Sequence, residues 1–346
     1  MPSLFRLSRD IGIDLGTTSV LVYLDGRGII INEPSAVALD RVSGKVLAVG
    51  SAAKKMLGRT PGNIVAARPL KNGAISDYDM TATMLGEYLR RLTRMSLVKP
   101  RVVVSVPSGI TEVEERAVIQ ATMEAGARRV YLIEEPLAAA MGAGMNIAGA
   151  GGSMVIDIGG GTTDIAVLSL NNVVKSTSID TAGDAFDDAI IQYVRERYQV
   201  LIGSQTAEEV KMAIGCVHPR PETLAMNVKG RNLSTGLPQD VDITSVDVMH
   251  ALTTPCRDIL YAVRSTLEKT EPELVADISR SGITLTGGGA LVYGMDTLLY
   301  RSTGIACHVA DDAILCVALG CGKSLRWIDQ MQEGTINLAR RKLMAE

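Results

Sequence analysis

The sequence predicts an α/β fold in which one strand–turn–strand unit occurs twice. One copy, Ser153 to Leu170, reads SMVIDIGGGTTDIAVLSL: two short apolar runs rich in β-branched residues, joined by a glycine-rich turn. The other copy, Ile11 to Leu24, reads IGIDLGTTSVLVYL and has the same order of strand, aspartate, glycine, two threonines and strand. Such recurrence indicates a duplicated unit, with chance similarity of two hairpins as the alternative.

The residues between the two copies add the helices of this fold. Strands and helices alternate there, which predicts a mixed sheet covered by helices. The expected elements are a strand over 102–106, a helix over 112–125 with a Thr111/Glu114 capping box, a strand over 129–133, and a helix opened by Glu134-Glu135-Pro136.

Other segments are predicted from their periodicity and turn residues. The uncharged run 136–156 contains five glycines, so we expect a short helix, a loop and a strand there, and no membrane span. The remaining expectations are a small insertion over 28–70, an amphipathic helix over 77–93, a helix with a Thr206/Glu209 capping box, a peripheral sheet over 218–247 and a long helix over 248–269.

Composition excludes several classes of protein. The 346 residues suffice for two or more domains, each with its own core. A formal net charge of −3 and 3% aromatic residues argue against a general nucleic-acid binder. The five cysteines form no CxxC pair, which makes a structural zinc site improbable and suits a reducing cytosol.

The two hairpins contain the residue types of a nucleotide–Mg²⁺ site. Glycine-rich turns let a ligand approach the main-chain amides, which bind phosphate oxygens. Asp14 and Asp157, each at the end of a strand, supply hard oxygen for a hydrated cation. Each segment alone is equally compatible with a tight turn whose glycines only satisfy backbone geometry. The P-loop and protein-kinase motifs are absent.

Two further features have a functional and a purely structural interpretation. Glu135 lies where a strand ends and a helix begins, so it could orient a water molecule for attack on a γ-phosphate, or could simply stabilise the helix N-terminus. By position alone the second interpretation is favoured. The segment 94–101 reads RMSLVKPR, which fits either a helix–strand connection or a loop that inserts Met95, Leu97 and Val98 into an anionic membrane surface.

Five stretches taken together resemble the actin-like ATPase superfamily. They are IDLGTTSVLV at 13–22 with its preceding isoleucine and glycine, IEEPLAAAMGAG at 133–144, IDIGGGTTDIAV at 156–167, EEVK at 208–211 and LTGGGALVYG at 285–294. Within the superfamily, the runs IVAARPLKNGAISDY, VPSGITEVEERAV and ELVADISRSGITLTGGGALV make the chain similar to the MreB family of bacterial actins, from about Asp10 to Trp327.

The resemblance implies a duplicated actin-like (ribonuclease H-like) two-lobed fold that binds ATP and Mg²⁺. It implies that Asp14 and Asp157 contact magnesium through waters, and that Glu135 positions the lytic water, which reverses the preference stated above. The implied nucleotide-binding residues are Gly16, Thr17, Thr18, Ser19, Gly159, Gly160, Gly161, Thr162, Gly183, Glu208, Glu209, Lys211, Gly287, Gly288, Gly289 and Ala290.

The resemblance also implies four subdomains and a set of partners. The expected bounds are 10–34, 73–150 and 318–338 for subdomain IA, 35–72 for IB, 151–183 and 248–317 for IIA, 184–247 for IIB, with an N-terminal segment 1–9 and a mobile tail 339–346. Family members form double protofilaments at the inner face of the cytoplasmic membrane and organise the cell-wall elongation machinery through transmembrane adaptors. Thr18-Ser19 stands where many relatives have Ala-Asn. Separately, the segment 1–9 is short for a membrane-binding amphipathic helix, so 95–98 is the favoured membrane contact.

Two other functions are known on the same scaffold. A small-molecule kinase would need a catalytic base beside the γ-phosphate and a sugar pocket, and the sequence offers no candidate pair. A chaperone-type ATPase is disfavoured because we see no substrate-binding domain after Trp327. The expected protein is therefore a filament-forming, weakly hydrolysing ATPase of the cytoplasm.

Overall fold

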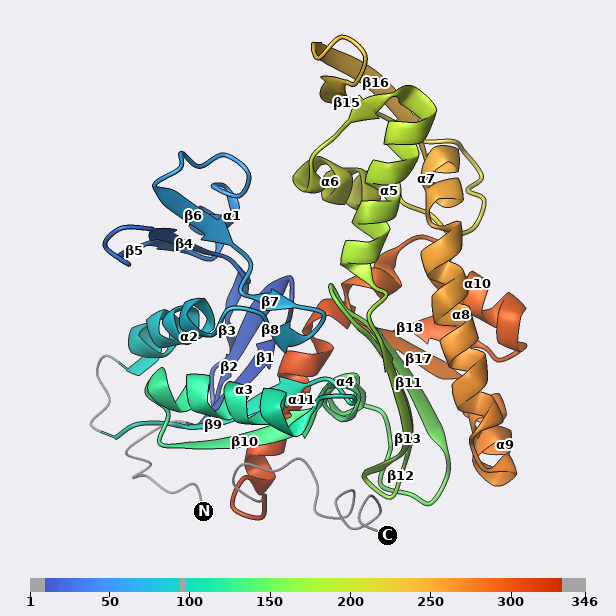
Figure 1. The fold of residues 1–346 in the computed structure, drawn as a ribbon. Helices are drawn as coiled ribbons and strands as arrows, with labels where there is room; N and C mark the ends of the chain where they lie inside the picture. Colours follow the sequence, from blue (N-terminus) through green and yellow to red (C-terminus); the bar gives the residue numbers. More distant parts are fainter. Residues whose placement is uncertain (1–9, 94–97, 332–346) are drawn as a thin grey trace. The chain divides into compact units, whose positions relative to one another are not determined.

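The computed structural model describes residues 10–93 and 98–331, and they form two compact units. Unit 1 contains the described residues up to Met145 together with those from Leu315 onward, and unit 2 spans Asn146–Ile314. The four subdomains expected from the sequence are a finer division, and their bounds stay a prediction. Figure 1 shows the helices and strands of both units, coloured along the sequence.

Unit 1 is built on a five-stranded mixed sheet in the order β10-β9-β1-β2-β3. Strands β1 to β3 form an antiparallel meander, β9 runs parallel to β1, and β10 runs parallel to β9. The strands are β1 Ile11–Leu15, β2 Ser19–Leu24, β3 Gly28–Pro34, β9 Arg101–Val106 and β10 Arg129–Glu134.

Unit 2 repeats this topology with other residues. Its five-stranded sheet has the order β13-β12-β11-β17-β18, in which β11 to β13 form the antiparallel meander and β17 and β18 continue it in parallel. The predicted duplication is thus confirmed at the level of strand connectivity. The strands are β11 Ser153–Ile158, β12 Thr163–Ser169, β13 Asn172–Ile179, β17 Ile283–Thr286 and β18 Cys307–Val309.

The two-residue period of β1 decides which side chains meet which helices. Ile11, Ile13 and Leu15 are buried in one core with apolar residues of α2 Tyr78–Thr93. Gly12 lies on the opposite face, where a Cβ atom would stand 2.9 Å from Cβ of Cys321 in α11 Cys316–Ser324. Asp14 is on this second face by the same alternation, so it points to the side of the sheet that α11 covers.

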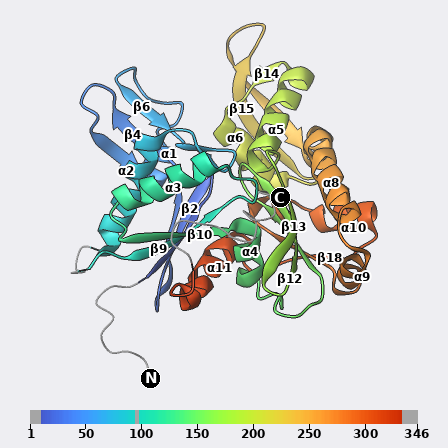
Figure 2. The same ribbon diagram turned by 60° about the horizontal axis from the view of Figure 1, so that its bottom comes forward.

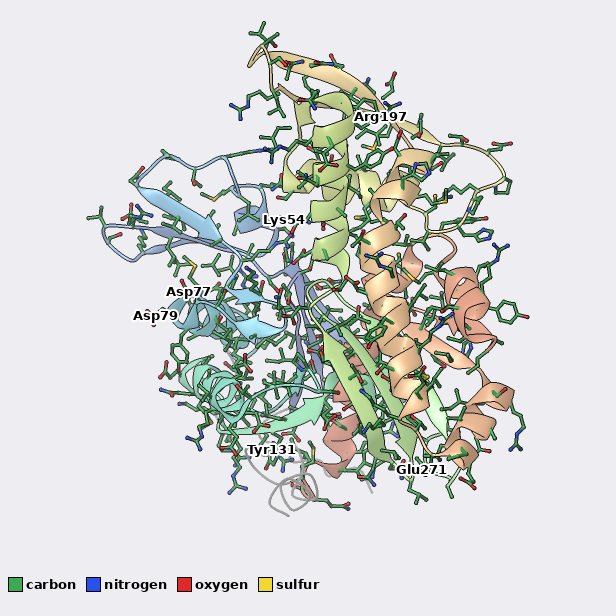
Figure 3. All side chains as sticks on the ribbon, turned by 45° about the vertical axis from the view of Figure 1, so that its right-hand side comes forward. Lys54, Asp77, Asp79, Tyr131, Arg197 and Glu271 are labelled. Carbon is green, nitrogen blue, oxygen red and sulfur yellow. The ribbon has the colours of Figure 1, made fainter. Side chains whose placement is uncertain are left out.

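The helices follow the sequence prediction closely in unit 1. α3 Glu112–Glu124 begins with the predicted capping box, in which the Glu114 amide donates to the Thr111 hydroxyl and the Glu114 carboxylate accepts from the Thr111 amide. α4 Glu135–Gly142 has its proline in the first turn. Asp77, labelled in Figure 3, lies just before α2. It accepts a hydrogen bond from the Met80 amide at 2.9 Å. The remaining helices of this unit are α1 Ser51–Lys54 and the 3₁₀ turns η2 Ala313–Leu315, which begins in unit 2, and η3 Leu325–Trp327.

Two helix predictions in unit 2 were wrong in detail. α6 Ser204–Ile214 begins after Gly203 with no side-chain cap, so Thr206 lies inside the helix and forms no capping box. The predicted long helix is two helices, α7 Ser245–Ala251 and α8 Thr253–Glu268, because Pro255 suits only a first turn and the chain restarts there. The other helices of unit 2 are α5 Gly183–Tyr198, α9 Pro272–Ser281, η1 Gly288–Leu291 and α10 Met295–Thr303.

Small sheets complete both units. In unit 1 they consist of short strands within the predicted insertion and just after it, whereas Gly28–Pro34 belongs to the main sheet. The run 136–156 forms a helix, a loop and a strand as predicted, and none of the helices in the described ranges has the length and apolarity to cross a membrane. The small strands are β4 Val37–Asp40, β5 Val46–Val49, β6 Ile64–Ala67, β7 Leu70–Lys71 and β8 Ala74–Ile75 in unit 1, and β14 Val200–Leu201, β15 Ala225–Asn232 and β16 Pro238–Thr244 in unit 2.

Candidate functional site

The carboxylate of Asp14 is held by a hydroxyl from the neighbouring strand. Asp14 is in β1, half-buried, and Ser105 lies in β9, which runs parallel to β1. The Ser105 hydroxyl donates to Asp14 Oδ1 at 3.3 Å. This hydrogen bond fixes the side chain at the end of the strand.

The turn from Gly16 to Thr18 is fixed by contacts to its carbonyl groups. The buried Ser35 donates its hydroxyl to the Gly16 carbonyl at 2.5 Å and its amide to the Thr18 carbonyl at 2.9 Å. The Thr17 hydroxyl accepts from the Gly73 amide at 2.9 Å. Within the described part of the chain, the buried Thr18 hydroxyl has no hydrogen-bond partner, which is unusual unless a ligand or water supplies one. Ser19 follows at the start of β2.

Glu135 lies in the same unit as Asp14 and close to the same point. It is 7% exposed at the first turn of α4, directly after Glu134, whose carboxylate accepts from the Ser108 hydroxyl at 3.2 Å. The pKa of the Cys321 thiol is raised well above its usual value, first by burial and then by the negative charges of Asp14 and Glu135. One buried thiol of α11 therefore faces both carboxylates, and unit 1 brings them together.

Glycines set the distance between the two helices behind these carboxylates. α4 and α11 lie side by side in both ribbon views (Figures 1 and 2). A Cβ atom on Gly142 of α4 would stand 1.7 Å from the Cys316 carbonyl oxygen, and one on Gly320 of α11 would stand 1.8 Å from the Ala138 carbonyl oxygen. No side chain fits in either place, so the two backbones are in direct contact and the position of Glu135 relative to α11 is tightly determined.

Asp157 in unit 2 is held in the same way as Asp14, but in a drier environment. Thr286 of β17, which pairs with Asp157 in the parallel ladder, donates its hydroxyl to Asp157 Oδ1 at 2.6 Å. Asp157 is 5% exposed, and burial raises its pKa to about 6 although the Thr286 hydrogen bond lowers it. Burial makes the ionised form of this carboxylate costly, and a cation that approaches it would favour that form.

The glycine turn of unit 2 is hydrogen-bonded to the start of α5. The Gly159 amide donates to the Thr162 carbonyl at 2.9 Å, which closes the turn. The amides of Gly183 and Asp184 donate to the carbonyls of Gly159 and Gly160 at 3.1 and 2.7 Å. The turn carbonyls are thus occupied by a helix N-terminus, which carries positive partial charge. Gly161 and Thr162 are buried beside them.

Lys211 connects α6 to this cluster. Its ammonium group donates to the Gly183 carbonyl at 2.8 Å and forms an ion pair with Asp187 Oδ1 at 2.8 Å. Burial raises the pKa of Asp187 to about 6, the charge of Lys211 lowers it, and Glu208 and Asp184 raise it. Glu208 is one turn before Lys211 and half-buried, whereas Glu209 is exposed.

The third glycine turn packs against the end of β11. Gly287 has φ +81°, and a Cβ atom there would stand 2.3 Å from the Ile158 carbonyl oxygen. A Cβ on Gly289 would stand 2.3 Å from Cγ2 of Ile158, whereas one on Gly288 would meet nothing within 4 Å. Ala290 is buried. Unit 2 therefore gathers the segments 157–162, 183–187, 211 and 287–290 around one strand end.

Sequence patterns assign no site role to five polar residues of these clusters, of which Glu134 is predicted only as part of a helix start. Ser105 and Thr286 brace the two aspartates, Glu134 binds Ser108, and Asp187 pairs with Lys211. Asp187 stands four residues after Gly183, one helical turn, which is the only local signal for it, and Asp188, five residues after Gly183, lies nearly as close to that spacing.

The predicted membrane contact is only partly within the structure. Met95 and Leu97 lie outside the described residues, and Val98 is half-buried. The segments 1–9 and 339–346 also fall outside the described ranges, as does the end of 318–338. In the described part of the chain, no three His, Cys, Asp or Glu side chains are grouped so that they could hold a metal ion.

The chain is similar to a protein family and to several solved structures. The family model "MreB/Mbl protein" matches residues 8–333. The chain is 50% identical over 328 residues to the cell shape-determining protein MreB of Escherichia coli K12, covering 93% of this chain and 94% of that protein. Crystal structures of Spiroplasma citri MreB5 bound to ADP and to AMPPNP each align with a TM-score of 0.89 at 38% identity, covering 93% and 95% of this chain and 97% and 98% of theirs.

A further solved structure bears on the fold alone. The MamK double helical filament aligns with a TM-score of 0.77 at 21% identity, over 92% of this chain and 98% of that chain. Together with the repeated sheet topology, these alignments confirm the predicted duplicated α/β fold of the actin type.

Proposed function

The chain belongs to the MreB/Mbl family, and from this premise we propose that it is an actin-like filament protein that binds ATP with Mg²⁺ and helps to set cell shape. The relatives named cell shape-determining proteins and the ADP- and AMPPNP-bound MreB5 structures support this proposal. The observation that carries it is the repeated strand end: each unit presents one aspartate braced by a hydroxyl and followed by a glycine turn.

The residues fit the proposed ligands. One carboxylate per unit, Asp14 and Asp157, suits a cation that keeps most of its water shell, as Mg²⁺ does beside nucleotide phosphates. The turns Gly16–Ser19 and Gly159–Thr162 offer amides and hydroxyls to phosphate oxygens, and the Thr18 hydroxyl has no partner within the described residues. When bound, Mg²⁺ neutralises charge that develops on the phosphates.

The unit 2 cluster fits the nucleoside. Lys211 and Glu208 lie one turn apart on α6 beside Gly183, and we assign them, with Glu209 at the exposed edge, to the ribose and base. Gly288, where a Cβ would meet nothing, leaves room for a flat ring beside Gly287, Gly289 and Ala290.

Glu135 is the proposed catalytic residue of a weak ATPase. Its carboxylate would orient the attacking water and accept its proton, and the buried position beside Asp14 and Cys321 holds it in place. Slow hydrolysis would then time the life of the polymer. Nucleotide binding would favour the polymer by the difference between the nucleotide's affinities for the polymer and for the free subunit.

A pair of neighbouring substitutions tests the catalytic assignment. Glu135→Gln should leave ATP affinity within about twofold and slow phosphate release by about 10²-fold or more, the usual contribution of a positioned base. Glu134→Gln is the matched control, since it is also buried, adjacent in sequence, and retains an acceptor for Ser108. Equal phosphate release from the Glu135 variant and the unsubstituted protein at saturating ATP would remove Glu135 from this role.

We further propose that the chain assembles with itself as double protofilaments at the inner face of the cytoplasmic membrane, attached mainly through 95–98. There it would organise the cell-wall elongation machinery through transmembrane adaptors. Pelleting and electron microscopy with ATP and anionic liposomes test the assembly. The double substitution Met95→Asp, Leu97→Asp should abolish sedimentation with liposomes, and unchanged co-sedimentation would exclude this attachment.

A further inference from the structure

Strand β13 is an edge strand that the described chain leaves open on one side. Its only partner there is β12, and no described strand pairs with its outer edge. An edge strand directs main-chain N–H and C=O groups outward, and proteins usually protect such edges with charges, prolines or bulges. In β13 the register irregularity lies before Lys175, the only charged residue of the strand, so Lys175–Ile179 is a regular open edge.

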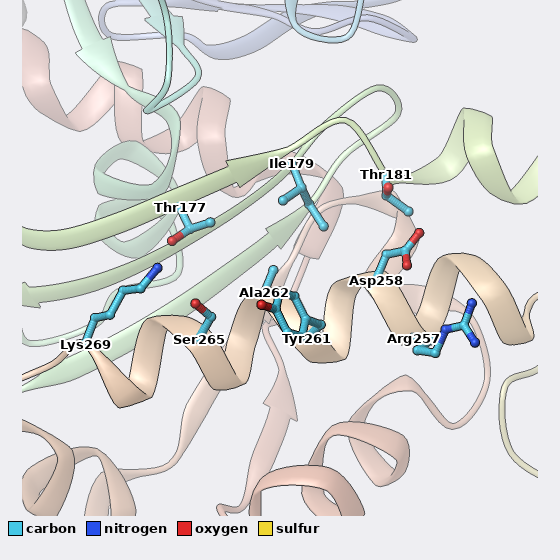
Figure 4. A pocket seen from close by; sticks show the side chains of 9 residues that line it. All are labelled: Thr177, Ile179, Thr181, Arg257, Asp258, Tyr261, Ala262, Ser265 and Lys269. Carbon is cyan, nitrogen blue, oxygen red and sulfur yellow. The ribbon is translucent and has the colours of Figure 1, made fainter.

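A groove runs beside this edge, between β13 and α8. It encloses about 600 Å³ and is lined by Thr177 and Ile179 on the strand side and by Tyr261 and Ala262 on the helix side (Figure 4). A groove between an edge strand and a helix is the geometry in which an extended peptide adds to a sheet and inserts alternate side chains. Tyr261 is 75% exposed at the rim, where an aromatic side chain can cover a bound segment.

Lys269 lies at one end of the groove, and Asp258 and Arg257 lie at the other. Lys269 extends toward Thr177 and Asp258 lies beside Thr181 (Figure 4). Neither charged group has a hydrogen bond or ion pair with any described residue, which leaves both available. Asp258 lies within α8 and Lys269 directly follows it, eleven positions later, or about 16 Å at about 1.5 Å per helical residue. An extended chain covers that distance in about five residues.

We propose that β13 and α8 form a docking groove for an extended partner peptide that adds to β13 as an antiparallel strand. Because β13 runs from the Lys269 end toward the Asp258 end, an antiparallel peptide enters at Asp258. The peptide therefore carries a basic side chain against Asp258 and, about five residues later, an acidic side chain against Lys269. Small or β-branched residues lie between the two, over Ile179 and Ala262.

A labelled peptide tests the backbone part of this proposal. The probe is the capped hexapeptide lysine-threonine-valine-threonine-valine-glutamate, titrated with the full chain by fluorescence anisotropy. Two versions carry N-methyl groups on alternate sets of amides. One version should lose about tenfold or more in affinity because its methyl groups face β13, and the other should bind nearly as well as the parent. Equal affinities of the two versions, or no binding of the parent at about millimolar concentration, would overturn the proposal.

A charge exchange tests the direction of the peptide. Asp258→Lys and Lys269→Glu should each weaken binding about two- to fivefold, as for other solvent-exposed ion pairs. The double variant should prefer the peptide with lysine and glutamate exchanged. Glu268→Lys, on the same helix but outside the groove, is the matched control and should change nothing. Unchanged thermal unfolding and nucleotide binding verify the folding of each variant, and a double variant that still prefers the original peptide would contradict the proposed direction.

Discussion

The two units contain the same five-stranded sheet, and the same hydrogen bond recurs at the same place in each. In unit 1 Ser105 donates to Asp14 at 3.3 Å, and in unit 2 Thr286 donates to Asp157 at 2.6 Å. The two aspartates differ in burial, since Asp14 is half-buried whereas Asp157 is 5% exposed and its pKa is raised to about 6. The two units therefore share the hydroxyl–carboxylate hydrogen bond but differ in how far the carboxylate is exposed to solvent.

The units also differ in what supports the braced strand. In unit 1 the glycine contact between α4 and α11 holds the face of the sheet where Asp14 lies. In unit 2 the turn at Gly287 presses directly on Ile158, the residue after Asp157. One copy thus depends on helix–helix contact and the other on a loop with a left-handed glycine, so each copy can be perturbed separately.

The largest expected effect is the loss of these close contacts. Gly142→Ala places a Cβ 1.7 Å from the Cys316 carbonyl, and Gly287→Ala adds left-handed strain to a 2.3 Å clash, so each should cost about 3 kcal/mol or more of unfolding free energy. Gly86→Ala, in α2 with its nearest neighbour at 3.8 Å, should instead stabilise by about 0.5–1 kcal/mol. Thermal unfolding of the nucleotide-free protein measures these changes. An unchanged unfolding free energy in Gly142→Ala would contradict the tight contact between α4 and α11.

The second effect is a dependence of stability on pH that Asp157 should cause. The pKa of Asp157 rises from 3.8 to about 6 on folding, so between these values the folded state holds a proton that the unfolded state has released, and stability falls as pH rises. Above pH 6 the folded protein has lost the full contribution to its unfolding free energy, which is about 3 kcal/mol because each unit of pKa shift corresponds to about 1.4 kcal/mol.

Asp157→Asn should therefore stabilise the nucleotide-free protein by up to about 3 kcal/mol at pH 7.5, because it removes the buried charge and keeps an acceptor for Thr286. It should also flatten the dependence of stability on pH between 4 and 6, apart from the contribution of Asp187, whose pKa is also raised to about 6. Asp14→Asn, at the half-buried position, should change stability much less. Denaturant unfolding across this pH range measures both, and a destabilised Asp157→Asn would show that the carboxylate is not desolvated.

The third effect concerns the two hydroxyls. Thr286→Val leaves a buried carboxylate oxygen without its donor and should cost about 1–3 kcal/mol at neutral pH, with a further rise in the pKa of Asp157. Ser105→Ala should cost less, because the hydrogen bond is longer and water can reach the half-buried Asp14. Chemical denaturation at pH 7.5 measures the unfolding free energy of both variants. A larger loss of unfolding free energy in Ser105→Ala than in Thr286→Val would contradict this prediction.

The smallest effect compares one helix cap from each unit. Thr111 caps α3 and Thr244 caps α7, both through complete capping boxes, so alanine at either position should cost about 1 kcal/mol. Thr206→Ala, inside α6, should be neutral or slightly stabilising because alanine is the better helix former. If Thr206→Ala lost as much stability as the other two variants, Thr206 would act as a helix cap after all, contrary to the structure.

Local sequence patterns determined the elements that carry the candidate site. The alternation of Ile11, Ile13 and Leu15, the aspartate at each strand end and the glycine turns predicted both hairpins, because side-chain period and turn chemistry are properties of neighbouring residues. Glu134-Glu135-Pro136 predicted the start of α4 for the same reason. The resemblance assigned roles to these residues, but it named none of the groups that brace them.

Only the tertiary structure decided those braces. Ser105 is 91 residues from Asp14, and Thr286 is 129 residues from Asp157, and periodicity tells which face a side chain takes but not which distant hydroxyl it meets. The Asp187–Lys211 ion pair and the Gly142–Cys316 contact likewise join separate helices. Burial, and with it the raised pKa of Asp157, follows from packing that the whole unit completes, because desolvation is the sum of all neighbours and no local pattern records it.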